Sequence, residues 1–237
     1  MSKVAVVTGA GSGVGRAVVV RMAREGWNVA LIGRSADSLN ETIRLSGSPE
    51  GKLLGFPCDI GDQKAVTDVA ANVDRSLGAA SALVNSAGTN VPKRSLDVLS
   101  SEDFDTMIRT NLNGAFYFVH AFLPAMKRGG GGTIVNIISD AAIIPNAKAG
   151  PGYCASKFGV RGLTQSINIE QRQHGIRATG IFPGDIDTPL LNRRPVPPTP
   201  EQRAQMLQPE DVAECVMLAI NLPHRAVVEE LVVRPRY

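Results

Sequence analysis

The first 26 residues constrain the fold of this chain more than any other stretch does. A run rich in β-branched residues at positions 3–8 is of the kind that is buried on both faces in a parallel sheet. A glycine-rich turn follows at positions 9–15, and a helical pattern then continues through Arg24 to Gly26. Strand, glycine-rich turn and helix in this order indicate a dinucleotide site, because the glycines let a pyrophosphate approach the helix N-terminus. The alternative is an ordinary glycine-rich turn.

Strand and helix patterns alternate along the rest of the chain, which predicts an α/β fold. The expected strands span residues 3–8, 28–33, 52–57, 82–84, 133–138, 176–182 and 227–233. We therefore predict a single Rossmann-type, doubly wound domain over residues 1–237, with a mostly parallel seven-stranded sheet flanked by helices. A hydrophobic content of 43% in 237 residues is enough to build one such core.

Two features of the helical and loop regions add to this prediction. Residues 102–127 form a long helical pattern that is kinked or interrupted near Gly114. Residues 189–208 are polar and proline-rich, and they are too many for a connector in a compact domain. We expect this segment to be a lid or a substrate loop, whose substrate-facing candidates are Asn192, Arg193, Arg194 and Met206.

Composition argues against several functional classes. The formal net charge of +3 is slight and the basic residues are scattered, so no nucleic-acid surface is expected. No apolar run approaches the roughly 20 residues of a membrane span, and no signal-peptide pattern precedes the first strand. The cysteines and histidines lack disulfide-framework or metal-ligand spacing, so we expect no metal site and a cytoplasmic location. These residues are Cys58, Cys154, Cys215, His120, His174 and His224.

Tyr153 and Lys157 form the pair with the clearest chemical potential. On a helix, residues four apart leave the same face, about 5–6 Å apart at Cβ. A tyrosine pKa near about 10 makes a poor base, and lowering it by about 3 units requires roughly 4 kcal/mol. One ammonium about 5 Å away supplies roughly 3 kcal/mol at an effective dielectric of about 20. The pattern therefore favours a proton-transfer tyrosine, although an amphipathic residue beside a snorkelling lysine has the same letters.

Ser139 follows the expected strand at residues 133–138. Its hydroxyl could hold a substrate oxygen against the phenol as a second hydrogen-bond donor.

The end of the second strand bears on the choice of cofactor. The strand ends in Gly33-Arg34, with no carboxylate at the tip. Dinucleotide folds use a carboxylate there for the ribose 2′-hydroxyl of NAD, and an arginine nearby for the 2′-phosphate of NADP. This predicts NADP(H), with NAD as the alternative if Arg34 is only solvated and Asp37 contacts the ribose. Asp37 fits better in the first turn of a helix capped by Ser35.

Two further strand ends carry candidate cofactor contacts. Asp59 follows the third strand, where it could accept a hydrogen bond from an adenine amino group or cap a helix that begins near Asp62. The fourth strand ends in Asn85-Ser86-Ala87-Gly88, whose small residues permit backbone contact with a cofactor. A turn would use the same letters.

Four motifs therefore lie in order along one doubly wound pattern. They are the turn from Thr8 to Gly15, Asn85-Ser86-Ala87-Gly88, Ser139 with Tyr153 and Lys157, and Pro183-Gly184 with Thr188. Together they resemble the short-chain dehydrogenase/reductase family, and the resemblance covers essentially the whole chain.

The resemblance implies a role for each matching residue. Tyr153 would be the catalytic acid in reduction and the base in oxidation, Lys157 would lower its pKa and bind the nicotinamide ribose, and Ser139 would orient the carbonyl. Asn111 would hold a water that relays protons to the lysine. The implied cofactor contacts are Gly9, Ser12, Gly13, Val14 and Gly15 for the pyrophosphate, Asp59 and Ile60 for the adenine, Asn85 with Ala87 and Gly88 at the strand end, and Pro183, Gly184, Ile186 and Thr188 near the carboxamide.

Three positions depart from common members of that family. Many members carry two serines where this chain has Ile138-Ser139, so only Ser139 can serve. Asp140 follows it, and this acid either binds a polar or cationic substrate group or faces solvent; we favour solvent. Many NADP-preferring relatives have a basic residue at the position of Ser12.

The function that these observations favour is hydride transfer between NADP(H) and the carbonyl or hydroxyl of a small organic substrate. A dinucleotide sensor without turnover is the alternative, but it does not require Asn111, Ser139, Tyr153 and Lys157 together. A methyltransferase would not explain the Tyr–Lys pair. By resemblance we also expect a homo-oligomer, a tetramer or a dimer, with the helices around Asn111 and Tyr153 packed against their copies.

Overall fold

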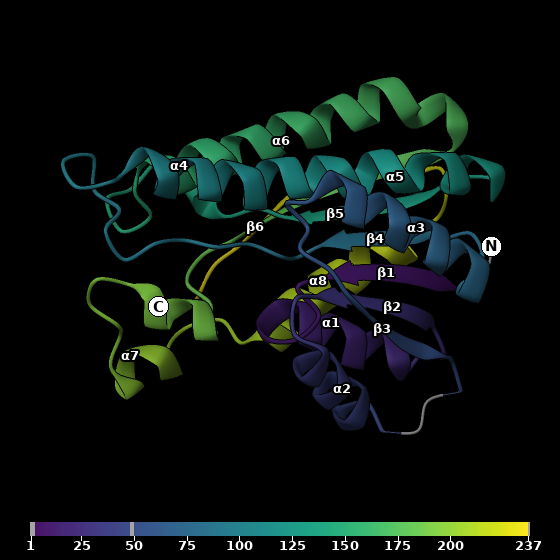
Figure 1. The fold of residues 1–237 in the computed structure, drawn as a ribbon, viewed down its shortest axis with the longest axis horizontal. Helices are drawn as coiled ribbons and strands as arrows, with labels where there is room; N and C mark the ends of the chain where they lie inside the picture. Colours follow the sequence, from purple (N-terminus) through teal and green to yellow (C-terminus); the bar gives the residue numbers. More distant parts are fainter. Residues whose placement is uncertain (1–2, 48–49, 237) are drawn as a thin grey trace.

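A twisted parallel sheet organises the molecule. The computed structural model describes residues 3–47 and 50–236. In that part of the chain seven strands pair in the order β3-β2-β1-β4-β5-β6-β7, and every pairing is parallel. The strands are β1 Val4–Thr8, β2 Asn28–Gly33, β3 Leu53–Pro57, β4 Ala82–Asn85, β5 Gly132–Ile137, β6 Ile176–Pro183 and β7 Glu230–Val233. The predicted doubly wound fold is confirmed (Figure 1).

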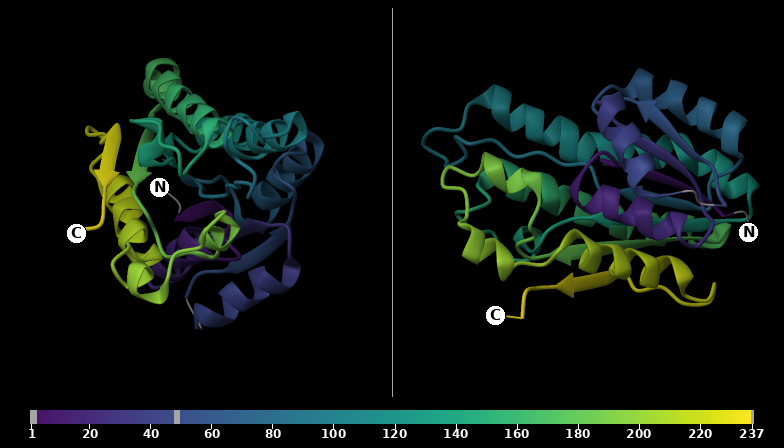
Figure 2. Two further views of the ribbon diagram at one scale, coloured as in Figure 1. Left: turned by 90° about the vertical axis from the view of Figure 1, so that its left-hand side faces the viewer. Right: turned by 90° about the horizontal axis from the view of Figure 1, so that it is seen from below.

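Helices cover both faces of this sheet (Figure 2). Alternate residues of β1 point to opposite sides: Ala5 and Val7 belong to one hydrophobic core, and Val4 and Val6 belong to the other. Helices α1, α2 and α8 supply the first core, and α3, α5 and α6 the second. The helices are α1 Gly13–Ala23, α2 Ala36–Leu45, α3 Gln63–Leu77, α4 Ser101–Met107, α5 Gly114–Arg128, α6 Pro151–Gln171, α7 Pro200–Ala204 and α8 Pro209–Asn221.

The expected interruption near Gly114 is a π-helical turn. Residues Ile108–Asn113 form this turn between α4 and α5, so the long helical pattern is three consecutive pieces. The turn contains Asn111, which is buried. A π-turn inside a helix is rare and frequently marks a functional site.

The last strand is shorter than the sequence pattern suggests. It begins at Glu230, whereas the pattern begins at residue 227. Arg177 holds the preceding segment in a turn, because its guanidinium donates hydrogen bonds to the carbonyls of Pro223 and Ala226. The ladder with β6 therefore starts only at Gly180 and Glu230.

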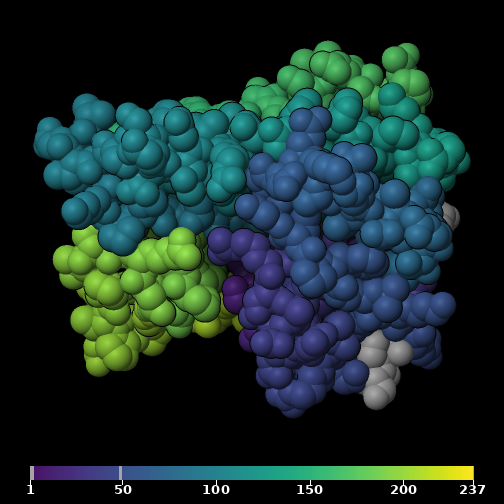
Figure 3. Space-filling model, in the orientation of Figure 1, coloured from purple at the N-terminus to yellow at the C-terminus, as the bar shows by residue number. Residues whose placement is uncertain are grey.

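The proline-rich segment 189–208 folds into a lobe beside the sheet. It contains a 3-10 turn at Pro189–Arg193 and the short helix α7. Figure 3 shows this lobe in light green, next to the blue and purple N-terminal half. An ion pair of 2.7 Å between Arg203 and Asp187 and a bridge between Ile186 and Leu207 fasten it to the chain after β6.

None of the helices in the described part of the chain has both the length and the apolar character needed to cross a membrane.

Candidate active site

The glycine-rich turn lies at the carboxyl end of β1, where the strand order switches direction. Gly9 has a φ of +67°, and a Cβ at this position would lie 2.9 Å from the backbone of Ala87. A Cβ at Gly15 would lie 2.3 Å from the carbonyl oxygen of Gly9. Both positions therefore require glycine, for backbone conformation and for close packing of helix on strand.

The N-terminus of α1 is suited to an anion. Its N-cap is Ser12, whose side chain makes no capping hydrogen bond, and the first turn contains no acidic residue. The first N–H groups of a helix have no intrahelical partner, and the helix dipole favours negative charge there. The turn and the helix end together fit the pyrophosphate of a dinucleotide.

A cleft of about 180 Å³ runs from this turn to Tyr153 and Lys157. Most of the predicted cofactor contacts line it. These residues are Gly9, Ser12, Gly13, Val14, Ala87, Gly88, Tyr153, Lys157, Pro183, Gly184, Ile186 and Thr188. The cleft is also lined by Ser86, from the predicted Asn85–Gly88 motif, and by four residues that sequence reasoning did not name as contacts: Ile137, Ile138, Pro189 and Leu190.

Arg34 and Asp59 lie outside this cleft. Arg34 is exposed at the end of β2 and has no hydrogen-bond or ion-pair partner among the residues that the structure describes. Asp59 is also exposed; it accepts a hydrogen bond of 3.0 Å from the Gly61 N–H, and it lies 3.9 Å from Arg109. It does not cap α3, because Asp62 accepts the hydrogen bonds from the first turn of that helix.

Three other predicted cofactor contacts do not line this cleft: Gly15, Ile60 and Asn85. Gly15 closes the turn against Gly9, and Ile60 is buried under Gly114 at the start of α5. Asn85 donates a hydrogen bond of 2.9 Å to Asn136 Oδ1, while its own Oδ1 is buried without a partner among the described residues.

Tyr153 and Lys157 lie side by side on α6, as their spacing predicts. The helix begins at Pro151 after the N-cap Gly150, which has a φ of +78°, so Tyr153 stands in its first turn. Lys157 Nζ is 5.7 Å from the centre of the Tyr153 ring. It donates a hydrogen bond of 2.8 Å to the carbonyl oxygen of Ile137, and the side chain is buried.

The pKa of Tyr153 differs from the sequence-based prediction. Burial raises it to about 12, while a hydrogen bond with Ser139 and the charge of Arg94 act in the opposite direction. Burial also lowers the pKa of Lys157 to about 8. Lys157 is therefore easier to deprotonate than a solvated lysine, and desolvation is the dominant effect on the Tyr153 hydroxyl. The expected depression of the tyrosine pKa is wrong for the protein alone.

Asn111 connects α6 to the loop after β4. Its Oδ1 accepts a hydrogen bond of 2.7 Å from the Thr89 N–H, and its Nδ2 donates to Thr89 O and Ser156 Oγ, each at 3.0 Å. Ser156 in turn donates to the carbonyl oxygen of Tyr153. The amide group is thus occupied by protein partners, so it fixes the first turn of α6 in place.

A second cavity, of about 450 Å³, adjoins the cofactor cleft. Ser139 and Tyr153 line both spaces, so these two candidate catalytic residues stand at the junction of the cleft and the cavity. Of the lobe residues proposed to face substrate, Arg194 lines this cavity, whereas Asn192, Arg193 and Met206 do not. The cavity also contains charged residues that sequence reasoning missed, because they come from separate loops: Arg94, Lys148, Asp185 and Arg234.

Asp140 lies in the wall of this second cavity. It is half-buried, 3.7 Å from Arg234, and it accepts a hydrogen bond of 3.4 Å from Ser139 Oγ. A place in the cavity wall is compatible with both predicted roles, and the choice between them stays a prediction.

No group of three or more His, Cys, Asp or Glu residues in the described ranges is arranged to hold a metal ion.

Comparison with known proteins gives a consistent result. A family model described as short chain dehydrogenase matches residues 3–196. An uncharacterized oxidoreductase of Staphylococcus aureus is 32% identical over 233 residues, which are 98% of this chain and 97% of that protein. An alcohol dehydrogenase from the archaeon Thermococcus sibiricus, complexed with 5-hydroxy-NADP, has a TM-score of 0.86 and 31% identity, covering 100% of this chain and 98% of that one. A closed form of serine dehydrogenase complexed with NADP+ has a TM-score of 0.88 and 29% identity, covering 98% and 94%.

Proposed function

This chain belongs to the short-chain dehydrogenase family of oxidoreductases, and from that premise we propose that it transfers a hydride between NADP(H) and the carbonyl or hydroxyl group of a small organic substrate. The observation that carries the proposal is the position of Ser139 and Tyr153, at the junction of a glycine-lined cleft and a separate substrate-sized cavity.

The proposed roles follow from the hydrogen-bonding capacity of each group. In reduction, Tyr153 Oη donates its proton to the substrate oxygen, and Ser139 Oγ donates a hydrogen bond to the same oxygen. In oxidation, Tyr153 accepts that proton. A nicotinamide dinucleotide, when bound, supplies or accepts the hydride. Lys157 Nζ donates one hydrogen bond to the Ile137 carbonyl at the end of β5. This bond fixes the position of the ammonium, and its other N–H groups, which have no hydrogen-bond partner among the described residues, remain free to bind the cofactor.

Several features of the chain support NADP(H) over NAD(H). Arg34 stands exposed at the end of β2 without a partner among the described residues, and no carboxylate occupies the strand tip. An arginine in this place suits a 2′-phosphate. The two solved relatives described above were crystallised with NADP-type cofactors, which agrees with this preference.

We also propose that the protein is a cytoplasmic homo-oligomer, either a tetramer or a dimer. Helices α5 and α6 expose the large apolar side chains Phe116, Phe158 and Ile169, the last of them 82% exposed. Apolar side chains on neighbouring helices mark an interaction surface when they form a contiguous patch. Light scattering on the purified protein would show a multiple of the 25.1 kDa chain mass.

The proposal is tested by following NADPH and NADH oxidation against a panel of ketones, diketones, quinones and aldehydes. We expect turnover with NADPH ahead of NADH. Tight binding of NADPH with no turnover on any carbonyl compound, and no oxidation of the matching alcohols by NADP+, would refute the enzyme and favour a cofactor sensor.

A further inference from the structure

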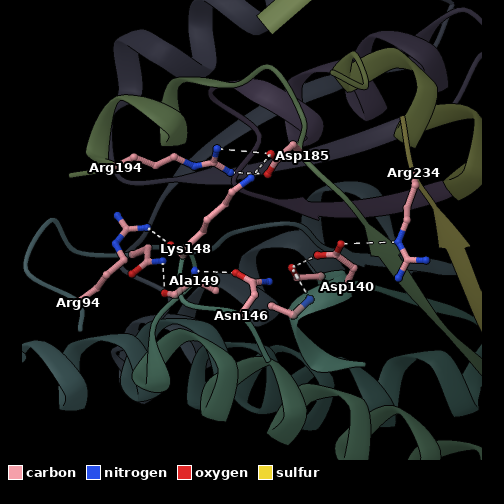
Figure 4. A network of polar contacts seen from close by, with 11 residues as sticks. Arg94, Asp140, Asn146, Lys148, Ala149, Asp185, Arg194 and Arg234 are labelled. Carbon is pink, nitrogen blue, oxygen red and sulfur yellow. Dashed lines mark hydrogen bonds and ion pairs between the residues drawn. The ribbon is translucent and has the colours of Figure 1, made fainter. Parts of the chain in front are cut away.

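The substrate cavity carries more positive than negative charge. In the described part of the chain, its walls contain four basic and two acidic side chains (Figure 4). They are Arg94, Lys148, Arg194, Arg234, Asp140 and Asp185. They come from segments as far apart as the loop after β4 and the residue after β7, so they meet only in the folded protein.

Three of the four basic residues have a carboxylate partner. Arg194 forms an ion pair with Asp185, and Lys148 Nζ lies 3.8 Å from the same carboxylate. Arg234 lies 3.7 Å from Asp140. Both carboxylates of the cavity are therefore engaged, and neither is open to a cationic substrate group without displacing an arginine.

Arg94 is the exception. It is only 6% exposed, and no carboxylate within residues 3–47 and 50–236 lies at ion-pair distance from it. Its guanidinium donates instead to backbone carbonyls: Nε to Val91 at 2.6 Å, Nη1 to Lys148 at 3.1 Å and Nη2 to Arg193 at 2.6 Å. Burial lowers the pKa of Arg94, and the charge of Arg194 lowers it further. A buried charge without a counter-ion is costly.

The guanidinium also has unused donors. Arginine has five N–H groups, and three of them are bonded to the carbonyls. One N–H on Nη1 and one on Nη2 therefore remain. Two N–H groups on one guanidinium match the two oxygens of a carboxylate, which is the geometry of the strongest arginine pairs.

Arg94 is close enough to the reacting centre to act on the same molecule. It lines the cavity together with Ser139 and Tyr153, and its charge acts on the pKa of the Tyr153 hydroxyl. A ligand whose oxygen binds Ser139 and Tyr153 can therefore reach Arg94 with a second group.

We propose that the substrate is a small oxo or hydroxy acid whose carboxylate binds Arg94, with its carbonyl or hydroxyl group at Ser139 and Tyr153. This inference rests on the proposed function, because it specifies the substrate class of the same site. The substrate anion supplies the counter-ion that no carboxylate of the described residues provides.

Arg94 also has a purely structural reading. Its three hydrogen bonds join the loop after β4 to residues 148 and 193, so it clips three segments around the cavity. A clip alone would affect charged and neutral substrates equally. A carboxylate-binding residue would affect only the charged ones. The difference between the two readings is therefore measurable.

The test compares each oxo acid with its own methyl ester. Acetoacetate, 2-oxobutanoate and levulinate are assayed with NADPH beside their esters, using the wild-type protein and the Arg94→Gln, Arg94→Lys and Arg128→Gln variants. Arg128 is an exposed surface residue paired with Asp74, so it controls for loss of one positive charge. We expect kcat/KM for the preferred acid to exceed that of its ester by roughly tenfold to a hundredfold, through KM. Arg94→Gln should abolish this ratio, Arg94→Lys should retain part of it, and Arg128→Gln should leave it unchanged.

A binding measurement keeps the test independent of turnover and of the variants' folding. Titration calorimetry compares each acid with its ester on the wild-type protein saturated with NADP+. Tighter binding of an acid supports the inference even if no compound turns over, in which case only the proposed function fails. Turnover of neutral ketones without tighter binding of any acid overturns the inference and leaves the proposed function intact. Equal losses of kcat/KM on acid and ester in Arg94→Gln would show that Arg94 only holds the three loop segments together, and would overturn the inference. Preference for a phosphate ester over every carboxylate would overturn the assigned substrate class.

Discussion

The cofactor cleft and the substrate cavity are adjacent, yet backbone groups line the first and charged side chains line the second. The cleft is shaped by backbone: glycines at positions 9 and 15, the N-terminus of α1 and the small residues after β4. The cavity is shaped by charged side chains from loops scattered between residues 94 and 234. A backbone site presents the same groups to any dinucleotide, whereas a side-chain site selects one ligand. The fold thus separates a generic half of the site from a specific half.

Replacing Tyr153, which stands at the boundary of the two halves, should have the largest effect. Tyr153→Phe removes the proposed proton donor and keeps the ring that lines both spaces. We expect kcat to fall by roughly a thousandfold, because general acid–base groups contribute about 10²–10⁴. NADPH affinity, measured by fluorescence titration, should change by less than about threefold. A variant with most of its activity would show that the proton comes from another group.

Gly15→Ala tests whether the cofactor half depends on backbone packing. The added Cβ would lie 2.3 Å from Gly9 O, so either the turn or α1 must shift. We expect a loss of about 3 kcal/mol in unfolding free energy and weaker NADPH binding. The matched control is Gly55→Ala in β3, where the nearest atom to the added Cβ would lie 3.4 Å away, at an ordinary contact distance. This control should stabilise the protein by about 0.5–1 kcal/mol. Similar effects of the two changes would contradict the packing argument.

The stability of the protein should depend on pH through Lys157. Burial lowers its pKa to about 8 from an ordinary value of 10.5, so between these values the unfolded chain binds a proton that the folded protein has released. Stability contributed through this group therefore rises with pH across that window, and the buried charge is destabilising below it. Urea unfolding of wild type and Lys157→Met should show the wild type gaining roughly 3 kcal/mol on the variant between pH 7.5 and about 10.5. A constant difference would mean that Lys157 titrates normally.

Arg34 is predicted to be the one side chain that makes the cofactor half selective, and its effect should be the smallest. Arg34→Ala should weaken NADPH binding by roughly tenfold and leave NADH binding within about twofold, as expected for one exposed charged contact. Equal losses for the two cofactors, measured by the same titration, would remove the argument for NADP preference.

The cofactor cleft could be predicted from the sequence. The bounds of β2 match the sequence pattern. The strand–turn–helix order also placed the glycines correctly, because the positive φ of Gly9 and the contact of Gly15 with Gly9 O both arise within the turn. Tyr153 and Lys157 were also readable, because a spacing of four residues on a helix fixes their proximity.

The charged residues of the substrate cavity could not be predicted from the sequence in the same way. Arg94 and Arg234 lie in separate irregular segments, and only the strand order brings them to one cavity. The predicted lowering of the Tyr153 pKa was wrong for a related reason. Coulomb attraction follows from spacing, but the opposing desolvation depends on burial, which no local pattern contains.

The strand order also has a consequence for biosynthesis. β1 leaves the ribosome before the six other strands of the sheet, yet one of its two neighbours is β4. The hydrogen bond from Ser81 back to Val4 spans 77 positions. At roughly 5–20 residues per second, the apolar edge of β1 waits about 4–15 seconds for its partner. The nascent chain must shield that edge in the meantime, and the Gly9 turn meets Ala87 only after this delay. The glycine-rich turn is therefore synthesised early but reaches its final packing only later in synthesis.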